Sequence, residues 1–323
     1  MRRTFRVGGQ YLVVLMTVIG LNFALPRLAP GDPIDYLVPP ESGLVDPELR
    51  DRLSERYGLD GDNREQFGRY LSGLARGDLG VSVRDGRPVA EVLRQRIGWT
   101  VLLVGTAVVA STLLGVVLGF FAGWRRGSAW DVALLTGVLV VDALPAFFVG
   151  LLLLLAFSVE LSWFPVYGVS SAAAAGVLTW SADVLHRLVL PAATLTLAGV
   201  GSVFVVARAA MLSETGEDHL FGARANGLDE RSVRGRARRN ALVPVSTVSL
   251  LGFSTLVGVA AVVETVFAYP GLGSLALDAV RARDYPVLQA VFLLFSVVAI
   301  GVNLLNDLLY PVLDPRVRRV HGT

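Results

Sequence analysis

The pattern of hydrophobic and polar residues along the chain is that of a helical membrane protein. Five stretches run for 20 or more residues without a charged side chain, and a sixth is interrupted only by Asp142. This length matches the roughly 20 residues that a helix needs to cross a bilayer, whereas barrel strands would alternate over about ten residues. The predicted spans are 7–26, 101–123, 132–159, 188–207, 241–263 and 287–306. We therefore predict an all-α, polytopic membrane protein with six transmembrane helices.

Residues 161–182 also lack charge, and they carry Trp163 and Trp180 near their ends. Because tryptophan favours the membrane–water interface, we expect an outer loop with a shallow interfacial segment; a seventh span is the alternative. The placement of arginines decides between six and seven spans, because short cytoplasmic loops are enriched in positively charged residues. With six spans, 15 arginines fall in the cytoplasmic pieces 1–6, 124–131, 208–240 and 312–323, and 3 fall in the short outer loops 160–187 and 268–286. A seventh span would move the arginine-rich segment 208–240 outside, so we expect six spans in the cell membrane with both termini in the cytoplasm.

We expect three regions along the chain. An N-terminal segment with the first transmembrane helix occupies 1–29, an extracellular helical insertion occupies 30–98, and a core domain with five transmembrane helices occupies 99–323. No small-x-small cleavage site precedes Pro26, so the first helix should be retained rather than removed as a signal peptide.

The insertion shows two helix starts. Asp46-Pro47 places a capping side chain before a proline at the first helical position, and Asn63 is able to cap a second helix. A structural cap over the outer face and a substrate-binding role both remain open for this insertion.

The segment 208–240 has helix signals on both sides of Gly227. A first helix is expected from about Glu214 to Asn226, with Gly227 in the left-handed conformation that glycine adopts without a Cβ penalty. Asp229 should cap a second helix, which carries Arg231, Arg234, Arg236, Arg238 and Arg239. The alternative is a solvated loop whose arginines only set the topology.

Composition narrows the function further. The chain is 53% hydrophobic and 17% charged, against about a quarter charged in typical soluble domains. It contains no cysteine, which excludes thiol catalysis and cysteine metal sites, and its net charge of +2 is too small to suggest nucleic-acid binding. All 29 basic residues are arginine. Without the lysine of a P-loop, any ATP that drives this protein should be bound by another chain.

Short motifs then point to a family. In chain order they are Ala29–Pro33, Gly77–Ser82, Gly86–Val89, Leu190–Ala192, Glu217–Leu228, Arg239–Pro244, Glu264–Phe267, Pro270–Gly273, Arg283–Pro286, Asn303–Leu304 and Leu313–Arg316. Together they resemble the inner-membrane permeases of binding-protein-dependent ABC importers, specifically the first permease of the dipeptide, oligopeptide and nickel branch. The coupling motif of such permeases begins Glu-Ala-Ala, whereas this chain has Phe221, Gly222 and Ala223. Gly222 should weaken its helix by up to about 1 kcal/mol relative to alanine.

The resemblance implies a permease subunit that forms half of the membrane pathway for di- or oligopeptides or nickel. The chain itself would be no enzyme and would hold no cofactor or metal, because ATP hydrolysis would take place on partner chains. The implied partners are a second permease subunit in a heterodimer, two cytoplasmic ATPase subunits, an extracellular solute-binding protein and membrane lipid. The coupling loop would be 212–243. Its ATPase contacts would be Ala223, Arg224, Ala225, Gly227 and Leu228.

Three carboxylates lie in or beside the spans. Asp142 is near the middle of the third span, where a bare charge costs at least about 2.5–3.5 kcal/mol. It should line the pathway, with a polar contact between subunits as the alternative. Glu264 is expected at the outer end of its span, roughly 30 Å from Pro244, ordering the loop that follows. Asp307 is expected to pair with an arginine near the inner end of the last span.

Two other classes of protein compete with this interpretation. An ion-coupled secondary transporter would need its own intramembrane polar site, for which Asp142 beside Pro145 is the only candidate. An intramembrane hydrolase would need a base, but His186, His219 and His321 all lie outside the predicted spans.

Overall fold

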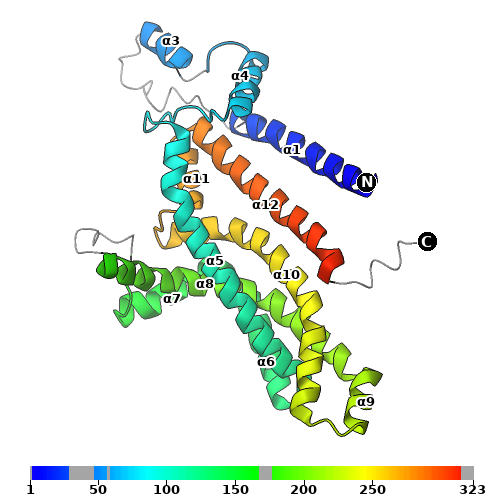
Figure 1. Cartoon of the computed structure of the whole chain (residues 1–323). Helices are drawn as coiled ribbons and strands as arrows, with labels where there is room; N and C mark the ends of the chain where they lie inside the picture. Colours follow the sequence, from blue (N-terminus) through cyan, green and yellow to red (C-terminus); the bar gives the residue numbers. More distant parts are fainter. Residues whose placement is uncertain (1, 29–46, 57–58, 167–176, 314–323) are drawn as a thin grey trace. The chain divides into compact units, whose positions relative to one another are not determined.

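The computed structural model describes residues 2–28, 47–56, 59–166 and 177–313, and most of them are helical (Figure 1). The helices are α1 (Arg2–Leu28), α3 (Pro47–Arg56), α4 (Asn63–Arg76), α5 (Val89–Trp124), α6 (Ala129–Asp142), α7 (Ala146–Leu153), a π-helical segment (Leu154–Glu160), α8 (Val177–Thr215), α9 (Asp218–Ala225), α10 (Glu230–Val266), α11 (Leu272–Arg281) and α12 (Tyr285–Leu313). Across the described ranges, extended pairing is limited to an isolated bridge between Val81 and Pro88. The predicted all-α class is confirmed.

Four helices are long and apolar enough to cross a membrane. They contain the segments Val89–Trp124, Ser181–Thr215, Glu230–Val266 and Tyr285–Asp307. A fifth span results if the bent pair Ala129–Asp142 and Ala146–Glu160 crosses the membrane as one unit. Helix α1 contributes a shorter apolar stretch, Gly9–Leu25. Several membrane spans are therefore present, and the total of six remains a prediction.

The third predicted span, 132–159, is not one straight helix. It breaks after Asp142 and resumes at Ala146, and the two parts meet at 99°. Pro145 sits in the break with extended backbone geometry, because its ring and missing N–H oppose continuation of the preceding helix. Our expectation of a continuous helix was wrong here. The break also places Asp142 at the end of α6 rather than within a continuous helix.

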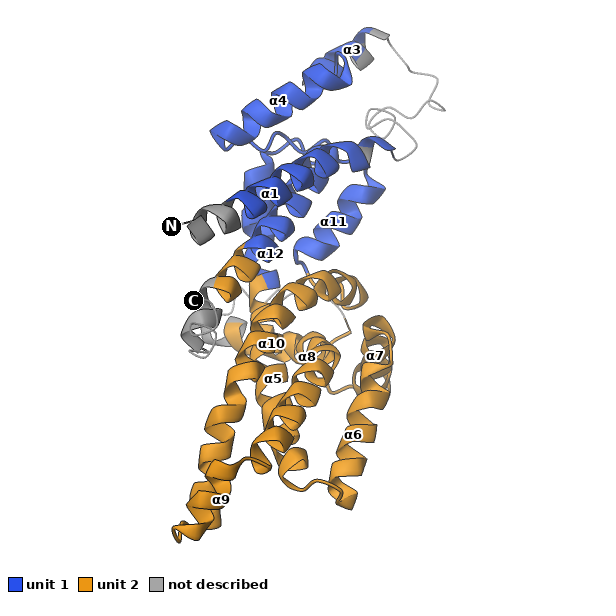
Figure 2. Ribbon diagram, turned by 90° about the vertical axis from the view of Figure 1, so that its right-hand side faces the viewer, with its two compact units in different colours: residues 1–100, 270–300 blue, residues 101–269, 301–323 orange. Residues whose placement is uncertain are grey.

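The chain divides into two compact units, coloured separately in Figure 2. One comprises residues 1–100 and 270–300, and the other comprises residues 101–269 and 301–323. Helices α5 and α12 each supply residues to both units. The division into 1–29, 30–98 and 99–323 stays a prediction.

In the first unit, α4 packs beside the end of α1. The rings of Phe23 and Phe67 lie 5.0 Å apart, and the Arg27 guanidinium lies 3.5 Å from the Phe23 ring centre while donating to Gln66 Oε1. The cap of α4 differs from our expectation by one residue, because Asp62 occupies the N-cap and accepts the Asn63 N–H at 2.7 Å. Aspartate and asparagine are both good caps, so the local sequence is compatible with either choice.

Some expectations fall outside the described residues. These are the Asp46 cap, the motif Ala29–Pro33, the side chain of Trp180, and everything from residue 314 onward, including His321 and most of Leu313–Arg316.

In the second unit, three glycines at four-residue spacing bring α5 close to α8. A Cβ added at Gly115, Gly119 or Gly123 would lie 2.7–2.8 Å from atoms of α8, including the backbone oxygens of Phe204 and Arg208. Small residues at this spacing allow membrane helices to pack backbone against backbone. The α5–α8 contact therefore depends on the absence of side chains along one stripe of α5.

A buried ion pair joins α6 to α8 in the same unit, just before the predicted span 132–159. Asp131, 3% exposed, accepts from Arg208 Nε at 2.7 Å and from Nη2 at 2.9 Å. The Gly127 N–H donates to the same carboxylate, while Ser128 Oγ accepts the Asp131 N–H at the start of α6. The hydrogen bonds from Arg208 hold the pKa of Asp131 below its usual range. Such a two-point pair fixes the orientation of both helices.

We predict that Gly119→Ala destabilises the protein by about 1–3 kcal/mol, because the new methyl group would meet backbone that has no room to move. Gly105→Ala is the matched control on the same helix, since nothing lies within 4 Å of its Cβ position. Thermal denaturation of the two variants in detergent measures the difference. Equal midpoints would show that α5 and α8 are not in close contact.

We also predict that Asp131→Asn destabilises the protein by about 3 kcal/mol, because Arg208 loses its charged partner in a buried place. Adding Arg208→Gln to this variant should cost much less than Arg208→Gln alone. Since the folded pKa of Asp131 is depressed, its stabilisation is fully present above its unfolded pKa of about 4 and is lost as pH falls further. Additive effects of the two substitutions in thermal denaturation would contradict the pairing.

Candidate functional site

The segment between α8 and α10 forms a compact helical arm, which we define as residues 216–240 (Figure 1). Helix α8 ends at Thr215, a turn follows, and α9 covers Asp218–Ala225. The predicted first helix was too long, because Glu214 still belongs to α8. Gly216 accounts for the difference, since glycine disfavours helix continuation at this point.

The joint between α9 and α10 forms as predicted around Gly227. Its φ of +79° is left-handed. The Gly227 N–H donates to Arg224 O at 3.0 Å and the Leu228 N–H donates to Ala223 O at 3.1 Å, which is the Schellman pattern at a helix end. Asp229 occupies the N-cap of α10. The predicted glycine joint and cap position are confirmed.

The arm has its own core and is not a solvated loop. Leu220 and Ala223 of α9 are almost fully buried, as are Val233 and Ala237 of α10. They pack in one cluster with residues of α5 and α8, namely Phe120, Val203, Ala207 and Met211. The arm is therefore tied to two long apolar helices as well as continuing into a third, α10.

An ion pair closes the arm across the glycine joint. Arg224 Nε lies 2.8 Å from Glu230 Oε1, and this hydrogen bond lowers the pKa of Glu230. Both side chains are exposed, so the pair contributes little to stability. Its effect is to hold Arg224 in one orientation on the arm surface.

The five residues predicted to contact the ATPase fall into two groups. Arg224, Ala225 and Gly227 are exposed. Ala223 is 3% exposed, and Leu228 is half-buried against the arm core. The first group forms a surface, and the second group supports it from inside.

The arm also exposes Phe221, a residue that stands out in the sequence only as a departure from Glu-Ala-Ala. This side chain is 74% exposed, whereas its neighbour Leu220 is fully buried. The signal was available in the pattern, since Leu220 and Ala223 at i, i+3 spacing define the inner face and leave Phe221 outside it.

Asp142 lies against α8 at Gly201. A Cβ on Gly201 would collide with Asp142 Oδ1, so only glycine allows the carboxylate to lie there. Asp142 is partly exposed, and within the described part of the chain it forms no hydrogen bond or ion pair. Its exposed side is therefore open to a neighbouring molecule.

Glu264 has a different environment. It is fully buried in the last turn of α10, and its backbone oxygen accepts the Tyr269 N–H at 2.7 Å. The structure thus separates the two predicted intramembrane carboxylates, because Asp142 is open on one side and Glu264 is enclosed. Their part in a transport pathway stays a prediction.

A cavity of about 270 Å³ lies between α5, α8 and α10. Its lining is apolar apart from hydroxyl groups and contains no charged side chain; the hydroxyls belong to Ser111, Thr112, Ser202, Ser249 and Thr255. Neither Asp142 nor Glu264 lines it. Such a wall offers hydrogen bonds to a polar solute without binding a cation tightly.

Comparison with known proteins gives a consistent assignment. The family described as "Binding-protein-dependent transport system inner membrane component" matches residues 115–319. The probable peptide ABC transporter permease protein y4tP of Sinorhizobium fredii is 35% identical over 308 residues, covering 95% of this chain and 96% of that protein. The oligopeptide transport system permease protein AppB of Bacillus subtilis is 33% identical, covering 94% and 95%.

A third relative is the glutathione transport system permease protein GsiC of Escherichia coli, which is 36% identical and covers 94% of each chain. The family match spans more than half of the chain, and these similarities run almost from end to end. The chain therefore belongs to the inner-membrane components of binding-protein-dependent transport systems, the permeases of ABC importers.

Proposed function

We propose that this chain is one of two permease subunits of an ABC importer for small peptides, driven through the arm by cytoplasmic ATPase subunits. The observation that carries this proposal is the arm surface formed by Phe221, Arg224, Ala225 and Gly227. It is exposed, apolar and basic, and it is mounted on a packed core. In this arrangement both termini and the arm lie in the cytoplasm, and an extracellular binding protein delivers the solute.

The arm has the mechanical properties that coupling requires. Helix α10 runs without interruption from Glu230 to Val266, about 55 Å at 1.5 Å per residue. The arm core also ties α9 to α5 and α8. A push on α9 would therefore be passed to three apolar helices together rather than absorbed by a flexible loop.

Two features support a peptide as the solute. The relatives are named for peptide, oligopeptide and glutathione transport. The cavity between α5, α8 and α10 presents hydroxyls and no charge, which suits peptide amides. Nickel would favour imidazole and other strong ligands, and in the described ranges no group of three residues able to hold a metal ion is found.

Ion-coupled secondary transport is the competing function, and Asp142 beside the break at Pro145 is the observation in its favour. An intramembrane carboxylate next to a broken helix is a common ion-coupling arrangement. Uptake into vesicles separates the two, since the proposed importer needs ATP and its ATPase partners, whereas a secondary transporter needs only a proton or sodium gradient.

We predict that Phe221→Ser abolishes stable assembly with the ATPase subunits and reduces uptake at least tenfold, because a buried aromatic anchor commonly contributes about 2 kcal/mol or more to an interface. Copurification of the ATPase subunits and ATP-dependent uptake measure the two effects.

Phe221→Leu is the matched control, since it keeps an apolar side chain at the same exposed position and should retain most assembly. Neither variant should alter thermal stability, because Phe221 is not part of the arm core. Normal assembly of Phe221→Ser would remove Phe221 from the docking surface.

The proposed orientation has its own test, which the absence of cysteine from the chain makes simple. Ala75 of α4 and Ala225 of the arm are both exposed. We expect a membrane-impermeant maleimide to label Ala75→Cys in intact cells and Ala225→Cys only after permeabilisation, with the cysteine-free parent as background. Labelling of Ala225→Cys in intact cells would contradict a cytoplasmic arm.

A further inference from the structure

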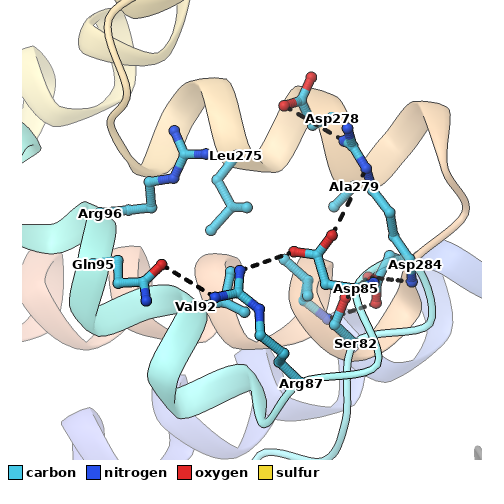
Figure 3. Close-up of a pocket in the computed structure, with 12 residues that line it drawn as sticks. Ser82, Asp85, Arg87, Val92, Gln95, Arg96, Leu275, Asp278, Ala279 and Asp284 are labelled. Atoms are coloured by element: carbon cyan, nitrogen blue, oxygen red, sulfur yellow. Dashed lines mark hydrogen bonds and ion pairs between the residues drawn. The ribbon is translucent and has the colours of Figure 1, made fainter. Parts of the chain in front are cut away.

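A small charged pocket lies in the first unit. Its volume is about 120 Å³, and it is formed by the turn 81–88, the first turns of α5, helix α11 and the start of α12 (Figure 3). Its floor is apolar and buried, with Val92, Leu275, Ala279 and Val287, while charged side chains occupy the rim. All of the charged residues belong to segments predicted to lie outside the membrane.

The pocket is held in shape by a buried carboxylate. Asp284, 2% exposed, accepts the Ser82 hydroxyl at 2.5 Å and the Arg84 N–H at 3.2 Å. The turn is closed further by the Ser82 N–H to Arg87 O and the Val89 N–H to Gly80 O. The pocket is therefore preformed and does not depend on an occupant.

The arginines on the rim are not equally neutralised. Arg84 lies 3.6 Å from Asp278, and Arg87 lies 3.4 Å from Asp85 and 3.7 Å from Glu91. Arg96 lines the same pocket and, among the described residues, has no carboxylate within 4 Å. Figure 3 shows it beside Leu275, without a dashed line to any neighbour. The lining carries three arginines and three carboxylates, and Arg96 is the arginine that no carboxylate of the described residues contacts.

We propose that this pocket receives an Asp or Glu side chain of the extracellular binding protein, with Arg96 as its ion-pair partner. The inference rests on the proposed function, which places the rim of this pocket outside the cell. The family match supplies the partner, since transport in this family depends on a binding protein. The pocket supplies the position of the contact, and Arg96 supplies its positive charge.

Size and energy favour a protein side chain over the free solute. Sites for small molecules usually measure about 300–1,000 Å³, well above the 120 Å³ found here. A partly exposed ion pair contributes little binding energy by itself, too little to retain a free peptide. The same pair is effective within a larger protein interface, where complementary charges raise the association rate and set the register.

The test compares Arg96→Glu with Arg94→Glu in the assembled transporter in nanodiscs. Arg94 lies two residues away on α5, is exposed and does not line the pocket, so the two variants carry the same charge change. We expect Arg96→Glu to weaken docking of the solute-loaded binding protein about tenfold, mostly through a slower association rate that depends on salt. Arg94→Glu should have little effect, and Arg96→Ala should be intermediate.

Rescue identifies the occupant. Reversing single acidic residues of the binding protein to arginine should restore docking to Arg96→Glu at one position only. Equal docking by Arg96→Glu and Arg94→Glu would overturn the proposal. So would an unchanged docking rate combined with weaker binding of free peptide or of anionic lipid. In either of these cases normal ATP-driven uptake would leave the proposed function intact, whereas a wild-type complex that transports without a binding protein would refute that function itself.

Discussion

The close approach of α5 to α8 is the contact on which the rest of the second unit depends. Three glycines leave one stripe of α5 bare, and α8 lies so near that a single methyl group would meet its backbone. The residues of α8 that cover this stripe, Val203, Ala207 and Met211, also belong to the arm core. The same side chains of α8 therefore hold α5 in place and support the arm. Widening the α5–α8 contact would loosen the support of α9 without touching the arm itself.

The charged groups of this unit show how a largely apolar chain places its carboxylates. Asp131 forms an ion pair with Arg208, and this pair joins α6 to α8. Glu264 is enclosed at the end of α10. Asp142 is covered on one side by Gly201 and is open on the other. Only an open carboxylate is available to a neighbouring subunit or a solute, so Asp142 is the one of these three whose role depends on the assembly.

Composition was sufficient to predict the helical membrane class, and local chemistry was sufficient for the Gly227 joint and the Asp229 cap. The course of individual helices was not predictable in the same way. Pro145 interrupts its helix, yet Pro191 and Pro244 lie inside the continuous helices α8 and α10. The same residue type breaks one helix and not another, because neighbouring helices and adjustments of the backbone decide whether the lost hydrogen bond is tolerated.

The exposed surface of the arm was predicted only in part for a related reason. Spacing alone placed the glycine joint, but which neighbours face inward depends on α5 and α8, far away in sequence. For this reason the spacing did not reveal that Ala223 is buried and Leu228 half-buried in the arm core, and their contact with an ATPase stays a prediction. The Asp131–Arg208 pair spans 77 residues, and no local pattern connects its two members.

The exposed hydrophobic residues of this chain lie in two kinds of surroundings, and those of Phe221 differ from the rest. Leu113, Val117 and Val262 are exposed on long apolar helices, where lipid or a second membrane subunit is able to cover them. Phe221 is more exposed than any of these, but it lies on a short helix between charged residues, where lipid would have to accommodate Glu217, Asp218 and Arg224 as well. An aromatic side chain in such surroundings is best covered by a protein groove that also offers carboxylates to Arg224. Under the proposed function, the arm surface therefore requires a partner with an apolar pocket and an acidic rim.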